Sequence, residues 1–79
     1  MPSHTLRHTR TVDTPHHRIH VVVYDDGFGV LTVTNTATGQ WHGEFVHNPT
    51  DADDLFTRVQ HHATWVGDCH PGLLLRVAR

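Results

Sequence analysis

The chain has 79 residues and a formal net charge of −2 when its ten histidines are neutral, so it has room for one domain with one small core. Its single cysteine, Cys69, excludes an intramolecular disulfide scaffold. The absence of lysine excludes Schiff-base chemistry.

The longest apolar runs, at 21–24 and 73–75, are too short to span a bilayer, and the first residues do not resemble a signal peptide. We therefore expect a cytoplasmic protein with no membrane contact. A lone cysteine is also typical of a reducing compartment. The arginine-only basic residues fit a GC-rich bacterial genome, and we expect an origin in a mobile element or phage.

The first twenty residues carry three arginines against one aspartate, whereas residues 21–79 carry three arginines against seven acids. We expect residues 1–15 to form a flexible basic, histidine-rich arm, with a weak edge strand over 6–12 as the alternative. Residues 16–79 then form one domain. Arg7, Arg10 and Arg18 are the candidates for contacting nucleic-acid phosphate.

The segment 18–24 is rich in β-branched residues and predicts a strand, as do 28–36 and 40–47. The turn signals at 25–27 and 37–39 separate them. On the third strand Trp41, Gly43 and Phe45 should share one face. The three strands are expected to form an antiparallel meander.

Thr50 is expected to cap a helix, because three aspartates follow it and apolar residues recur at helical spacing from Ala52 to Val66. Gly67 is a natural end for that helix. A short fourth strand is expected over 73–78. The predicted fold is therefore α+β, a three-stranded antiparallel meander covered by one helix in the C-terminal half.

Histidine is conspicuous, and three interpretations compete. A metal site would use His16, His20, Cys69 and His70, although their spacing matches no zinc-finger pattern. The histidines could act together as a pH switch, since they titrate near pH ~6.5. The third interpretation is polar surface filler. No catalytic residue and no cofactor are expected.

The aromatic residues exceed what one helix on three strands can hide. Tyr24, Trp41, His61 and Trp65 are therefore the candidates for a protein interface.

Residues 30–63, with the run 38–45 (Thr-Gly-Gln-Trp-His-Gly-Glu-Phe) followed by a Thr-capped helix, resemble the three-strand-plus-helix DNA-binding domains of a class of plant transcription factors and the arm-binding domains of integrases. The resemblance implies DNA binding by the outer sheet face. However, residues 28–47 contain no arginine or lysine, which argues against that face as the reading surface.

These observations lead to three hypotheses. The first is a non-enzymatic regulatory or interaction protein that binds another protein, with a homodimer as the expected partner. The second is a small DNA-binding regulator that uses the basic arm and the sheet. The third is a histidine-rich metal-binding protein.

Overall fold

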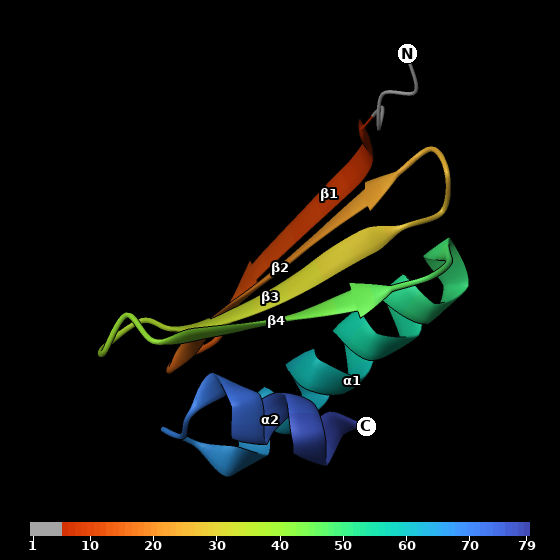
Figure 1. Cartoon of the computed structure of the whole chain (residues 1–79). Helices are drawn as coiled ribbons and strands as arrows, with labels where there is room; N and C mark the ends of the chain where they lie inside the picture. The colour runs from red at the N-terminus through yellow and green to blue at the C-terminus, as the bar shows by residue number, and fades with distance from the viewer. Residues whose placement is uncertain (1–5) are drawn as a thin grey trace.

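The computed structural model describes residues 6–79, and its fold is α+β. The elements in chain order are β1 (Leu6–Asp13), β2 (His17–Tyr24), β3 (Gly29–Asn35), β4 (Trp41–Val46), α1 (Pro49–Val66) and α2 (Pro71–Ala78). The strands form one antiparallel sheet in the order β1-β2-β3-β4 (Figure 1). Both helices pack on the same face of this sheet.

The position of the fourth strand was predicted wrongly. It lies before the meander, as β1, and not at the C-terminus. The segment expected to be the last strand is the helix α2, which begins at Pro71 and is capped by His70, whose Nδ1 accepts a hydrogen bond from the Gly72 amide at 3.0 Å. Proline at the first helical position and the leucines that follow favour a helix over the alternation that suggested a strand.

The strand β1 overlaps the expected N-terminal arm, of which residues 1–5 lie outside the described part of the chain. It pairs antiparallel with β2, from Leu6 opposite Tyr24 to Asp13 opposite Arg18, with one irregularity after Leu6. The structure therefore has the edge strand that was the alternative to a free arm over residues 6–12. Its polar residues suit the edge of a sheet, where one side of the strand is solvated.

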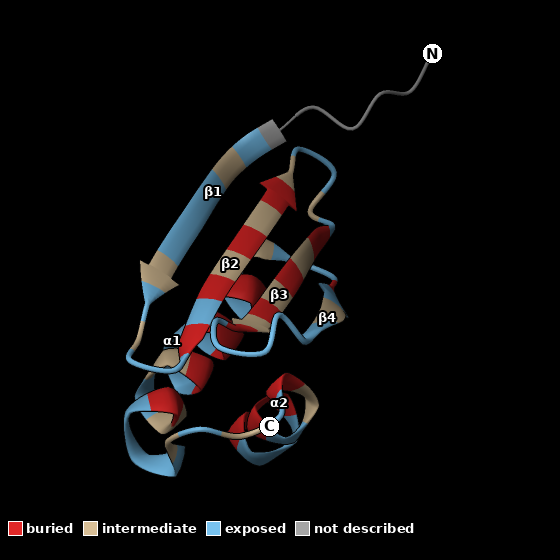
Figure 2. Cartoon of the chain, turned by 90° about the vertical axis from the view of Figure 1, so that its left-hand side faces the viewer, coloured by how far each residue is buried: buried red, intermediate tan, exposed pale blue. Residues whose placement is uncertain are grey.

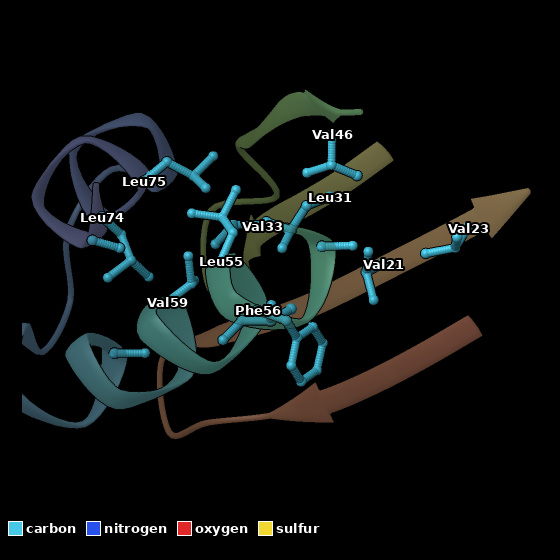
Figure 3. Close-up of a cluster of buried hydrophobic side chains, with 14 residues drawn as sticks. Val21, Val23, Leu31, Val33, Val46, Leu55, Phe56, Val59, Leu74 and Leu75 are labelled. Atoms are coloured by element: carbon cyan, nitrogen blue, oxygen red, sulfur yellow. The ribbon is translucent and has the colours of Figure 1, made fainter. Parts of the chain in front are cut away.

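The hydrophobic core lies between the sheet and the two helices (Figure 3). The inward residues of β2 and β3 alternate with half-buried ones, as a sheet covered on one face requires (Figure 2). The largest buried apolar side chains are Ile19, Leu31, Phe56, Leu74 and Leu75. Full burial of one such side chain contributes about 1.5–3 kcal/mol.

The N-cap of helix α1 lies two residues before the one that the sequence suggested. The N-cap is Asn48 and not Thr50, since the Asn48 Oδ1 accepts a hydrogen bond from the Asp51 amide at 2.8 Å. Pro49 then occupies the first helical position, where its missing amide hydrogen costs nothing. Within residues 6–79, neither helix combines the length and apolar character that a membrane crossing requires.

Candidate protein interface

Within residues 6–79, no element covers the face of the sheet opposite the helices (Figure 1). Antiparallel register places Val22, Tyr24, Val30, Trp41 and Phe45 on this face, and we call these five residues the open-face cluster. They share it because side chains alternate between faces along each strand and cross-strand partners point the same way. The cluster joins three neighbouring strands into one apolar surface.

Two members of the cluster are exposed aromatic residues on β4. Trp41 keeps 67% of its surface exposed and Phe45 keeps 73%. Gly43 lies between them on the same face, and the Trp41 Cζ3 atom lies 3.6 Å from the place that a Cβ on Gly43 would occupy. The Trp41 ring therefore leans along its own strand towards Phe45, and the two rings flank a residue without a side chain.

An open hollow of about 330 Å³ lies at one end of this surface. Its walls come from Tyr24, Phe28, Gly29, Val30 and Phe45, so they are almost wholly apolar. Phe28 is itself 49% exposed and makes an edge-on ring contact with His47. Apolar surface that is left exposed in this way is typical of a site that another protein covers.

The rest of the open face is polar, and Asp13 and Arg18 form an ion pair on it. The Arg18 Nε donates a hydrogen bond to the Asp13 carboxylate at 2.8 Å, and this contact lowers the pKa of Asp13 and raises the pKa of Arg18. Next to this pair, Thr11 and His20 form a side-chain hydrogen bond of 2.6 Å. The open face therefore offers apolar contacts more than a net charge.

The three arginines proposed for nucleic acid do not form one patch. Arg18 lies on the open face, paired with Asp13. Arg10 lies on the helix side, where its guanidinium is 3.4 Å from Asp53 and stacks 4.3 Å above the centre of the Phe56 ring. Arg7 is an exposed residue of β1. Two of the three positive charges are thus held by carboxylates of this chain.

The structure divides the four residues predicted for a protein interface into two groups. Tyr24 and Trp41 belong to the open-face cluster. His61 and Trp65 lie together on the exposed side of α1, with their rings 6.2 Å apart. Sequence reasoning did not name Phe45 as a site residue, although its alternation with Trp41 and Gly43 along the strand carried that signal.

A buried polar network, which the sequence did not reveal, fastens the sheet to the loop between the helices. His17 is fully buried, and its Nε2 lies 2.8 Å from the Cys69 carbonyl oxygen, which makes Nε2 the protonated nitrogen. The side-chain Nδ2 of Asn35 donates hydrogen bonds to the same Cys69 carbonyl oxygen and to the Asp68 carboxylate. The side-chain Oδ1 of Asn35 accepts a hydrogen bond from the Ala37 backbone amide. The remaining His17 nitrogen, Nδ1, is buried and has no hydrogen-bond partner among the described residues.

This network does not activate the cysteine. The Cys69 sulfur lies 4.0 Å from the His17 Nε2, but burial, and next the Asp68 carboxylate, raise the pKa of the Cys69 thiol. A raised pKa keeps the sulfur as the less nucleophilic thiol.

The four residues proposed for metal binding do not converge. His20 faces the open side of the sheet, Cys69 lies against the buried His17, and His70 caps α2. His16 is an exposed turn residue whose carbonyl accepts a hydrogen bond from the Thr36 amide. Across residues 6–79, no three His, Cys, Asp or Glu side chains come close enough to hold one ion.

Comparison with known proteins adds no relative: no family model, curated protein or solved structure matches the chain.

Proposed function

We propose that this chain is a non-enzymatic protein-binding module that associates with a second copy of itself through the open-face cluster. The observation that carries the proposal is the exposure of Trp41 and Phe45, which stand on the same open face of β4 with Gly43 between them. Tryptophan and other aromatic side chains dominate the energetics of protein interfaces because they bury much apolar area in few degrees of freedom.

Size favours such a partner. A domain of 79 residues buries a smaller fraction of its surface than a larger one does, and association is a common source of the missing stability.

The chemistry of the face fits a second copy better than a charged ligand. Asp13 and Arg18 on this face already pair with each other, so this pair does not oppose the approach of an identical surface. The exposed rings of one protomer can lie next to those of its partner across a two-fold axis. We place this function in the cytoplasm, because a single free cysteine suits a reducing compartment.

The test compares the molar mass of three proteins by size-exclusion chromatography with light scattering. The intact chain should form a dimer. A Trp41→Ser, Phe45→Ser double variant should be monomeric, because it loses the two most exposed aromatic side chains of the face. The control is Trp65→Ser, which removes an equally exposed tryptophan from α1 and should leave the dimer intact. A dimer that survives the double variant would contradict the proposal, whatever the control does.

A further inference from the structure

The geometry points to the manner of this association, and the inference rests on the proposed self-association. We infer that β4 pairs edge to edge with β4 of a second copy, antiparallel, about a two-fold axis at Gly43, which makes one continuous eight-stranded sheet. The partner is the same chain, and the recognition elements are the free backbone groups of β4 together with the two aromatic rings beside them.

The backbone groups of β4 point alternately towards β3 and away from it. At the β3–β4 turn, the Asn35 amide donates to the Gln40 carbonyl at 2.8 Å. Hydrogen-bonded and non-hydrogen-bonded pairs alternate along an antiparallel ladder, so His42 and Glu44 direct their amide and carbonyl groups towards β3. The residues between them, Trp41, Gly43 and Phe45, direct both groups away from β3.

Those outward groups lie on a free edge. β4 is the last strand in the sheet order, and no other strand within residues 6–79 pairs with its far side. The residues with outward backbone groups are also those whose side chains stand on the open face. Such a row of unpaired donors and acceptors is a template for another strand.

The positions of these outward groups favour one register between the β4 strands of the two copies. A two-fold axis at Gly43 sets Gly43 opposite itself and Trp41 opposite Phe45 of the second copy. Every residue in these pairs has outward backbone groups, so each pair exchanges two hydrogen bonds. This register pairs all three strand residues that have outward backbone groups. Other regular registers pair fewer of them with one another.

The side chains fit the same register. It places each tryptophan directly across from a phenylalanine, and cross-strand aromatic pairs stabilise a sheet. Gly43 at the axis has no side chain on the open face, which leaves space there for the neighbouring Trp41 ring. The Trp41 ring, which leans over Gly43, would then lie beside the axis.

The opposite edge of the sheet, which β1 forms, lacks the exposed aromatic residues of β4. β1 carries Arg7, His8 and Arg10, and charged residues on an edge strand discourage pairing. β4 carries one acid, Glu44, whose carboxylate accepts a hydrogen bond from the Arg79 guanidinium. The sheet therefore has one protected edge and one edge suited to a partner.

The experiment measures backbone amide exchange by nuclear magnetic resonance on the intact chain, at a dilution where it is monomeric and at a concentration where it is dimeric. The amides of Trp41, Gly43 and Phe45 should exchange at least about 10-fold more slowly in the dimer. Those of His42 and Glu44 should be protected in both samples, because they already bond to β3.

A pair of variants at the axis supplies the second measurement. Gly43→Pro removes the central outward amide hydrogen, which no β3 group uses, and should abolish the dimer while His42 and Glu44 keep their protection. Gly43→Ala is the control, since its Cβ would meet no atom closer than 3.6 Å and it retains the amide. It should dimerise like the unmodified chain.

The outcomes separate the two proposals. A dimer in which Trp41, Gly43 and Phe45 still exchange quickly, and which Gly43→Pro does not disrupt, overturns the edge pairing and leaves self-association through the sheet face. A chain that stays monomeric at every concentration overturns both. If Gly43→Pro does not fold, the exchange pattern of the unmodified chain decides alone.

Discussion

At the scale of single residues, the structure depends most on Asn35. Its side chain is 2% exposed, accepts hydrogen bonds from two turn amides and donates to Asp68 and the Cys69 carbonyl. It thus closes the β3–β4 turn and ties that turn to the loop between the helices. No other side chain links two segments so far apart in the sequence through as many of the described hydrogen bonds.

We expect Asn35→Asp to lower the free energy of unfolding by about 2–4 kcal/mol at neutral pH, as measured by urea denaturation. The substitution keeps the turn acceptors but sets a second carboxylate against Asp68. The introduced carboxyl has a raised pKa in the folded state, so it binds its proton more tightly there than in the unfolded chain. The deficit should therefore be full above that raised pKa, shrink as the pH falls through it, and be lost below about pH 4, where an unfolded aspartate also takes up its proton. An equal deficit at pH 3 and pH 7, to within about 0.5 kcal/mol, would contradict the role given to the Asp68 contact.

The second residue-scale prediction concerns Cys69, whose pKa is raised by burial and, after that, by Asp68. The native protein should react with iodoacetamide at pH ~8 about 10-fold more slowly than the urea-unfolded chain, because only the thiolate reacts. Asp68→Asn should increase the native rate, since it removes the nearby negative charge. A native rate equal to the unfolded rate would show that the thiol is neither shielded nor shifted.

Folding and protonation of this thiol are linked. Because the folded pKa lies above the unfolded value, the thiol favours the folded state below about pH 8.5, and that contribution is lost as the pH rises through the raised value. Alkaline conditions should therefore weaken the fold at this site, and neutral conditions should not.

At the scale of the elements, two glycines on facing strands have opposite constraints. Gly29, at the start of β3, is packed so closely that a Cβ would lie 2.5 Å from the Val22 carbonyl oxygen and 2.8 Å from Val46 Cγ2. Gly43 of β4 has ordinary space around it. The missing side chain of Gly29 therefore allows β2 and β3 to approach closely, whereas Gly43 has room for a methyl group.

Gly29→Ala should lower the free energy of unfolding by about 1–3 kcal/mol, because the backbone of β2 must move to admit a methyl group. Gly43→Ala is the matched control and should cost less than about 0.5 kcal/mol in the monomer. Thermal or urea unfolding of both variants measures the difference. Equal costs at the two positions would mean that the close approach of β2 and β3 at Gly29 is not maintained in solution.

The elements also show what local sequence could and could not predict. The β-branched runs and the intervening turn residues predicted β2, β3 and β4 because these signals lie within each segment. The last segment misled, since residues 73–78 alternate like a strand while Pro71 and the His70 cap make them a helix. The edge strand β1 was harder still, because its pairing with β2 is a tertiary contact that its polar sequence does not reveal.

At the scale of the whole molecule, sequence anticipated an uncovered sheet face but not all of its members. The count of aromatic residues indicated that some had to be exposed, and Trp41 and Tyr24 do lie on that face. His61 and Trp65 have the same composition signal and lie on α1, because an aromatic count carries no information about which layer a residue joins. The His17 and Asn35 network escaped notice since both are polar residues with no periodic apolar pattern around them.

The association proposed here follows from how the layers are distributed. Two helices cover one side of four strands, so the other side, and with it one weakly protected edge, is left to a partner. A joined edge of six residues is about 20 Å long, which belongs to small and reversible interfaces. We therefore expect a dimer that dissociates on dilution.

The most direct test is the molar mass of the unmodified chain by sedimentation velocity, over concentrations from about 1 μM to about 1 mM. The mass should rise from the 9.0 kDa of a single chain to twice that value, with no larger species, because a two-fold interface closes on itself. A single species of 9.0 kDa at every concentration would contradict the account.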